Sequence, residues 1–186
     1  MALDRSAVDS VLATIMSVVP PATIRLAGSA SSVLRGVDIP AADIDILFAD
    51  RTGVDAWVDS LGVRYVIETS PRWLPDARQY FARLDIAGVV VELSTVEIHT
   101  EHDTHEGFGP GPWRHFDHVE YSGGSVPAVA TELRLITEVL RGRGDRLLPI
   151  IEFLRRSTCD LDLVRRGLNN NGTPTNTVQR VLAQLE

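Results

Sequence analysis

The sequence contains no lysine and a single cysteine among its 186 residues. All 18 basic residues are therefore arginine, whose planar guanidinium stays charged and binds carboxylates or phosphates in a fork. The lone thiol, Cys159, excludes a disulfide within one chain and favours a reducing cytoplasm. No stretch approaches the ~20 apolar residues of a membrane span, and the N-terminus lacks the pattern of a signal peptide. We therefore expect a cytoplasmic protein with no membrane partner.

Negative charge is in excess over the whole chain, but its distribution is uneven. The formal net charge is −7. Residues 1–125 hold 9 Arg against 18 Asp and Glu, whereas residues 126–186 hold 9 Arg against 7 acids. The length suits one core of ordinary size or two small lobes. The asymmetry predicts an acidic lobe over residues 1–125 and a basic lobe over residues 126–186 that could face phosphates.

Hydrophobic periodicity predicts an α/β (α+β) protein in which helices flank a sheet. Apolar residues at helical spacing predict helices over residues 8–19, 53–61, 127–140, 145–156, 161–168 and 176–185. Apolar or alternating runs predict strands over residues 24–27, 43–48 and 63–69, and a hairpin over residues 80–97. Residues 70–75 are expected to form a loop bracketed by prolines, in which Trp73 covers the core or stacks on a base.

The clearest chemical signal lies between residues 24 and 48. An apolar strand ends at Gly28-Ser29, and residues 30–42 separate this pair from Asp43-Ile44-Asp45-Ile46. Side chains alternate between the faces of a strand, so Asp43 and Asp45 share one face, roughly 6–7 Å apart. Such carboxylates repel each other unless a cation such as Mg²⁺ lies between them. Gly28 allows backbone to approach a bulky anion, and Ser29 at a helix start offers N–H groups and a hydroxyl. The alternative is a turn glycine followed by a strand with a solvated acidic face.

This combination resembles the signature of the polymerase-β-type nucleotidyltransferase superfamily, in particular its small stand-alone bacterial members. In that superfamily two carboxylates on one strand and a third on a neighbouring strand hold two Mg²⁺ ions, which bind a nucleoside triphosphate. The resemblance implies a mixed sheet in a catalytic lobe over residues 1–125 and a helical lobe over residues 126–186. It implies transfer of a nucleoside monophosphate from a triphosphate such as ATP to a hydroxyl, with release of pyrophosphate.

The resemblance also requires a third carboxylate inside a hydrophobic strand further along the chain. Glu92 lies in the middle of the apolar run from Val89 to Thr95, where a glutamate without a partner is rare. We therefore expect Asp43, Asp45 and Glu92 to be the catalytic acids and metal ligands, with Gly28 and Ser29 binding the nucleotide. Asp85 is the rival for the third position, and Glu97 is a weaker one. Most members of the superfamily carry aspartate there, so glutamate is a departure.

In the small members a basic residue after the sheet helps to hold the triphosphate. The corresponding region, residues 127–146, offers Arg134, Arg141 and Arg143. We expect Arg141 and Arg143 to bind the nucleotide. The alternative is a solvated, charged helix end that complements the helix dipole.

All five histidines fall between His99 and His118, among several acidic residues. This composition is compatible with a zinc site. The segment has no cysteine and is rich in glycine and proline, so a loop beside the active site is the favoured interpretation.

The motifs do not identify the acceptor. The small size and the arginine-bearing helical lobe resemble bacterial toxins that add nucleotides to the 3′ end of tRNA and are silenced by a protein antitoxin. We therefore expect tRNA as the acceptor and an antitoxin as a partner. The alternatives are an adenylyltransferase that modifies an antibiotic or another small molecule, and a catalytically inactive nucleotidyltransferase fold used as a binding module.

Overall fold

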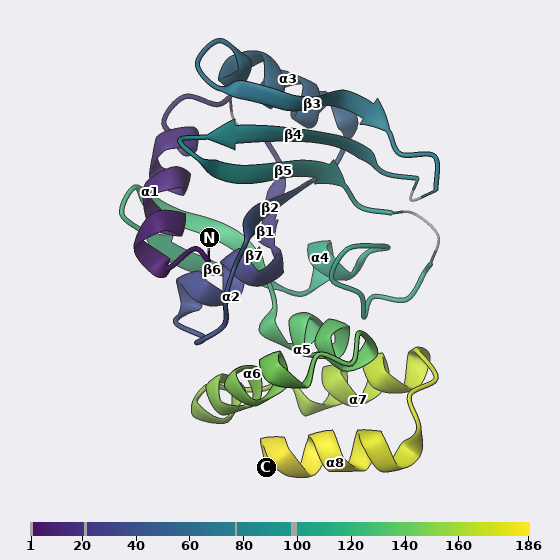
Figure 1. Ribbon diagram of the computed structural model, residues 1–186. Coiled ribbons are helices and arrows are strands. Elements are labelled where there is room, and N and C mark those ends of the chain that lie inside the picture. Colours follow the sequence, from purple (N-terminus) through teal and green to yellow (C-terminus); the bar gives the residue numbers. More distant parts are fainter. Residues whose placement is uncertain (1, 21, 77, 98–99) are drawn as a thin grey trace.

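A mixed sheet of seven strands forms the centre of the protein (Figure 1). The computed structural model describes residues 2–20, 22–76, 78–97 and 100–186. The strands are β1 (Ile24–Ala27), β2 (Asp43–Phe48), β3 (Val66–Trp73), β4 (Tyr80–Ile86), β5 (Val89–Thr95), β6 (Phe116–Tyr121) and β7 (Gly124–Val129). Their order across the sheet is β3-β4-β5-β2-β1-β7-β6, with β2 parallel to β5 and β1 parallel to β7. The predicted mixed sheet with flanking helices is confirmed.

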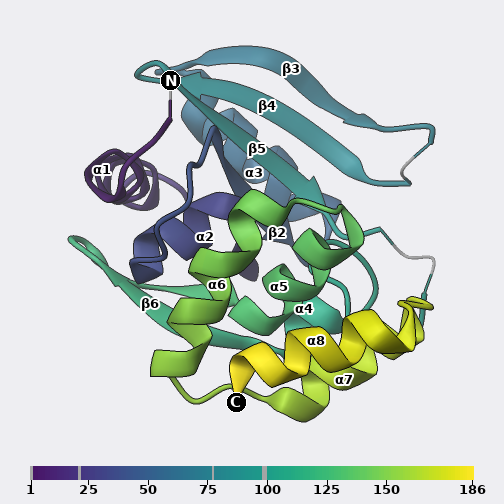
Figure 2. The ribbon, with the colours of Figure 1, turned by 60° about the horizontal axis from the view of Figure 1, so that its bottom comes forward.

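The helices fall into two groups (Figures 1 and 2). The first group is α1 (Arg5–Met16), α2 (Gly28–Arg35) and α3 (Arg51–Gly62), and the short α4 (Gly111–Arg114) precedes β6. The second group is α5 (Thr131–Leu140), α6 (Gly144–Arg156), α7 (Leu161–Asn170) and α8 (Thr175–Leu185). Helices α2 and α3 contact the strands, whereas α5 to α8 pack on one another beside the sheet. Among the described residues, no helix is long and apolar enough to cross a membrane.

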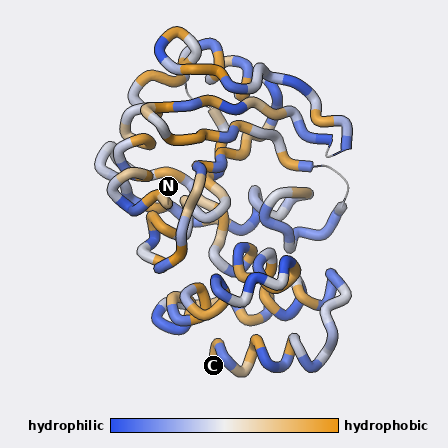
Figure 3. The backbone as a smooth tube through the Cα atoms, viewed as in Figure 1, coloured by the Kyte–Doolittle hydropathy of each residue, from blue (hydrophilic) through white to orange (hydrophobic). Residues whose placement is uncertain are grey.

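Alternation along the central strands divides the sheet into an apolar face and a face that carries acids. The side chains that are buried on β2 include Ile44, Ile46 and Phe48. The ring of Phe48 packs edge-on against Trp57 of α3, with 4.9 Å between the ring centroids. Asp43 and Asp45 point to the opposite face, as a side-chain period of two requires. Hydrophobic residues recur along the strands and helices, while the segment between β5 and α4 is largely hydrophilic (Figure 3). The core therefore lies on one side of β2, and the acids lie on the other.

The expected loop at residues 70–75 is wrong for residues 70–73, which belong to β3. β3 is an edge strand, and its register with β4 is interrupted between Thr69 and Arg72. Pro71 lies in this interruption, and a proline is tolerated at an edge or a bulge because its missing N–H removes no ladder hydrogen bond there. Trp73 is 55% exposed and packs edge-on against Tyr80, so it neither covers the core nor lines the site described below.

Strands β6 and β7 were not predicted, and the helix expected from Pro127 begins at Thr131. Pro127 lies in β7, opposite His118 of β6. In β6 only Val119 is buried, so the polar sequence of this edge strand gives no alternation that would reveal it. The expected boundary between residues 125 and 126 falls inside β7, and the sheet continues to Val129.

Candidate functional site

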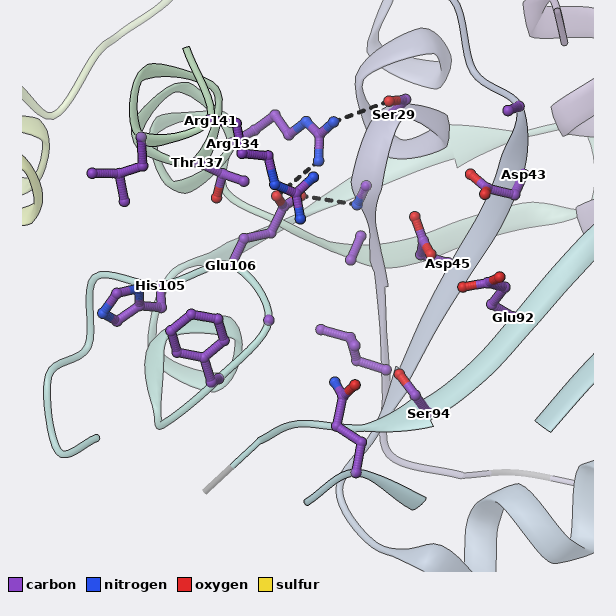
Figure 4. A pocket seen from close by; sticks show the side chains of 18 of the residues that line it. Ser29, Asp43, Asp45, Glu92, Ser94, His105, Glu106, Arg134, Thr137 and Arg141 are labelled. Carbon is purple, nitrogen blue, oxygen red and sulfur yellow. Dashed lines mark hydrogen bonds and ion pairs between the residues drawn. The ribbon is translucent and has the colours of Figure 1, made fainter. Parts of the chain in front are cut away.

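A cavity of about 750 Å³ opens on the acidic face of the sheet (Figure 4). The ends of β1 and β2, strand β5, the segment before α4, helix α5 and the start of α6 form its walls. Every residue predicted for the site lines it: Gly28, Ser29, Asp43, Asp45, Glu92, Arg141 and Arg143. The rival acid Asp85 is not among the lining residues. Its carboxylate instead accepts a hydrogen bond from the N–H of Gly88 at 2.7 Å, in the turn of the hairpin.

The three acids meet because of strand register. β2 and β5 are parallel, and Asp45 lies directly beside Glu92 in the ladder. Asp43 shares the same face of β2 two residues earlier. Burial raises the pKa of Asp45 to about 7, and the charges of Asp43, Glu92 and Glu106 contribute to the rise. Repelling carboxylates of this kind favour either a bound proton or a bound cation.

Glycine is the only residue type that fits at position 28, where β1 meets α2. Its φ of +67° is unfavourable for any residue with a side chain. A Cβ added at this position would lie 1.9 Å from Oδ2 of Asp45. The glycine therefore lets the N-terminus of α2 lie directly against the acids. This places backbone N–H groups with a positive helix end next to the expected metal ligands.

The carboxylate of Glu92 faces the cavity and also contacts an arginine on the other strand of its hairpin. Oε1 of Glu92 accepts a hydrogen bond from Nε of Arg83 at 3.0 Å and forms an ion pair with Nη2 of the same arginine. Arg83 lies opposite Glu92 on β4. The carboxylate of Glu92 points toward Asp45 in Figure 4. The third acid thus faces the site while one of its oxygens is held by an arginine.

Two arginines that were not chosen from the sequence reach the start of α2. Arg134 of α5 is buried, and its Nη2 donates to Oγ of Ser29 at 3.0 Å. Arg146 of α6 donates from Nη1 to the same oxygen at 2.6 Å. The predicted Arg141 and Arg143 line the cavity from an exposed position. Ser29 is therefore held by Arg134 and Arg146, and the basic side of the cavity extends beyond the predicted pair.

A buried glutamate fixes this cluster of arginines. Glu138 of α5 is fully buried and forms an ion pair with Nη2 of Arg134. Nε of Arg143 lies 3.8 Å from its Oε2, and Nη1 of Arg146 lies 3.7 Å from its Oε1. Arg134, Glu138 and Arg141 follow one another at spacings of four and three residues, which places them on one side of a helix. That spacing is the signal in the sequence that could have identified Arg134.

The donor set fits a hard divalent cation such as Mg²⁺, which takes carboxylate oxygens together with phosphate oxygens and water. Asp43, Asp45 and Glu92 offer only oxygen, and the backbone N–H groups at the start of α2 lie beside them. In the parts of the chain that the structure describes, no group of three His, Cys, Asp or Glu side chains is drawn together tightly enough to hold a metal as it stands.

The described histidines of the segment between His99 and His118 do not form one cluster. His99 lies outside the described residues. Nε2 of His115 lies 2.8 Å from Oδ2 of Asp103, and Oδ1 of Asp103 accepts a hydrogen bond from Arg166 of α7 at 3.0 Å. His105 stacks on Phe108 at the wall of the cavity, and His118 lies on β6. These contacts tie the segment to the helical lobe beside the cavity.

Comparison with known proteins identifies the fold. No protein-family model and no curated protein sequence matches the chain. The structure is similar to that of a candidate nucleotidyltransferase from Thermotoga maritima, with a TM-score of 0.60 and 20% identity, covering 84% of this chain and 98% of that one. It is also similar to an antigenic nucleotidyltransferase-like protein from Paracoccidioides brasiliensis, with a TM-score of 0.56 and 13% identity, covering 99% and 95% of the two chains. The chain therefore has the nucleotidyltransferase fold.

Proposed function

We propose that the protein is a nucleotidyltransferase that moves a nucleoside monophosphate from a nucleoside triphosphate to a hydroxyl acceptor and releases pyrophosphate. The observation that carries this proposal is the meeting of three acids with the N-terminus of α2 in one cavity. The volume of about 750 Å³ lies within the range of cavities that enclose small ligands. A nucleotide bound with its phosphates at α2 would place the α-phosphorus near the acids.

The residues divide the chemistry between them. Asp43, Asp45 and Glu92 would hold Mg²⁺, which when bound stabilises the attacking and leaving oxygens of an in-line displacement at phosphorus. Backbone N–H groups at Gly28 and Ser29 bind the β- and γ-phosphates, as helix N-termini do. The arginines that line the cavity neutralise the charge of the leaving pyrophosphate. Glu92 accepts the proton of the attacking hydroxyl at Oε2, because Arg83 occupies Oε1.

The acceptor is proposed in two forms. The excess of arginine over acids in residues 126–186 supports the tRNA 3′ end, in which case a protein antitoxin remains the expected partner. The ion pairs of the helical lobe support a small-molecule hydroxyl instead. Arg165 pairs with Asp162, and Arg166 lies 3.0 Å from Asp103. Arg156 lies 3.8 Å from Glu152. These acids neutralise arginines that would otherwise meet RNA phosphates.

The test is a transfer assay in which both kinds of acceptor are supplied. The protein is incubated with Mg²⁺, each nucleoside triphosphate labelled at its α-phosphate in turn, and either total cellular RNA or a panel of hydroxyl-bearing antibiotics. Label in a tRNA band supports the first form, and label in an antibiotic supports the second. Asp43→Asn is expected to abolish the labelling, whereas Asp59→Asn, an exposed change on α3, is expected to preserve it. Transfer that survives Asp43→Asn would contradict the proposed roles.

A further inference from the structure

Glu106 lies in the place that the proposed function reserves for a phosphate. Its Oε1 accepts a hydrogen bond from the N–H of Gly28 at 2.9 Å, and its Oε2 accepts one from Nη1 of Arg134 at 2.9 Å. Glu106 is only 7% exposed. A carboxylate with one oxygen on a helix N-terminus and the other on an arginine reproduces the contacts of a bound phosphate group (Figure 4).

This position is unfavourable for a permanent carboxylate beside a metal and nucleotide site. The charge of Glu106 contributes to the raised pKa of Asp45, so it adds a fourth acid to the three already there. A triphosphate on α2 would need the same N–H of Gly28 and the same face of Arg134. The two anions therefore compete for one subsite, and they cannot occupy it together.

The backbone around Glu106 is fixed, so its side chain is the part that can move. Asp103 is tied to His115 and to Arg166 of α7. On the other side, the N–H of Glu97 donates to the carbonyl oxygen of Gly107 at 3.1 Å. Thr104 is fully buried. A change of rotamer at Glu106 into the adjoining cavity would clear the subsite while these backbone contacts persist.

We propose that Glu106 is an internal competitor of the triphosphate and thereby raises the concentration at which any phosphate ligand occupies the subsite. The inference rests on the proposed function for its choice of ligand. A ligand must displace the carboxylate of Glu106 before it can occupy the subsite. This displacement lowers the affinity of all such ligands by one common factor. A single phosphate makes few contacts other than those with Gly28 and Arg134 that it takes over from Glu106. A triphosphate also reaches Arg141, Arg143 and Arg146, and so retains useful affinity.

The experiment measures binding of inorganic triphosphate and of inorganic phosphate in Mg²⁺ buffer by isothermal titration calorimetry. Glu106→Gln weakens the hold on Arg134, and a charge-assisted contact of this kind corresponds to about tenfold in affinity. Both probes are expected to bind about tenfold more tightly to Glu106→Gln than to the unmodified protein. Glu101→Gln, an exposed change in the same segment, is expected to bind as the unmodified protein does.

Glu106→Asp separates contact from charge. It keeps the negative charge but is too short to span both Gly28 and Arg134, so competition by contact predicts tighter binding, by a smaller factor. If charge repulsion alone weakens binding, Glu106→Asp should bind no more tightly than the unmodified protein. That result would overturn the inference. Glu106→Asp also decides the question if circular dichroism shows that Glu106→Gln is unfolded.

Other outcomes distinguish this inference from the function beneath it. Equal or weaker binding by Glu106→Gln would show that Glu106 supports Arg134 rather than competing with phosphate. If neither the unmodified protein nor any variant binds inorganic triphosphate, the phosphate subsite itself is refuted. Tighter binding by Glu106→Gln together with no nucleotidyl transfer to any acceptor would leave the competition standing and refute the proposed function alone.

Discussion

The raised pKa of Asp45 predicts that the metal-free protein loses stability as the pH rises from about 4 to about 7. An aspartate in the unfolded chain has a pKa of 3.8, and the folded environment raises that of Asp45 to about 7. Between these values the folded state binds a proton that the unfolded state has released. The contribution is therefore fully present below pH ~4 and is lost by pH ~7. Each pH unit between the two pKa values lowers the free energy of unfolding by about 1.36 kcal/mol. The total loss is therefore about 4 kcal/mol at most.

Asp45→Asn removes this dependence while keeping the size of the side chain. The free energy of unfolding, measured by urea denaturation in EDTA from pH 4.5 to 8.5, is expected to fall with pH in the unmodified protein. Relative to that curve, Asp45→Asn should gain stability as the pH rises, by up to about 4 kcal/mol near pH 8. Asp59→Asn, on the exposed side of α3, should follow the unmodified protein throughout.

Mg²⁺ provides the second half of the test. A cation that binds ionised Asp45 stabilises only the folded state and competes with the proton. Added Mg²⁺ should therefore raise the free energy of unfolding more at pH 8 than at pH 6, and it should do little for Asp45→Asn. Parallel pH curves for Asp45→Asn and the unmodified protein would refute the claim that buried, mutually repelling acids dominate this site.

Two further predictions concern the groups that surround the acids. Gly28→Ala should abolish nucleotidyl transfer and lower the free energy of unfolding by at least ~1–3 kcal/mol, because the new Cβ meets Asp45 and φ is +67°; unchanged transfer and urea midpoint would contradict this. Arg134→Gln should lower the free energy of unfolding by ~3–5 kcal/mol, because it leaves Glu138 buried without its nearest cation. Arg180→Gln, an exposed change on α8, should cost nothing measurable in the same urea experiment.

The parts of the site that could be predicted from the sequence depend on local rules. The period of two on β2 places Asp43 and Asp45 together whatever the rest of the chain does. A glutamate inside an apolar strand signals a special environment by its own rarity, which is why Glu92 could be chosen over Asp85. Gly28 and Ser29 follow from the chemistry of a strand that leads into a helix.

The parts that could not be predicted depend on contacts between distant segments. Glu106 reaches Gly28 across 78 residues, and Arg146 reaches Ser29 across 117, and no local pattern encodes either contact. β6 was missed because an edge strand with one buried residue has no apolar alternation. The charge balance of the helical lobe predicted a basic surface, but a count of arginines does not reveal that Arg165 and Arg166 are paired with acids.

The central claim is that Asp43 and Asp45 direct nucleotidyl transfer at the α-phosphorus. The most direct measurement supplies Mg²⁺ and total cellular RNA or an antibiotic acceptor with one triphosphate, labelled either at the α- or at the γ-phosphate. We predict that α-label appears on the acceptor and that γ-label is released as pyrophosphate. Both signals should vanish in Asp43→Asn and in Asp45→Asn. Label from the γ-phosphate on the acceptor, or α-label transfer that persists in the two variants, would refute the proposed role of the two aspartates.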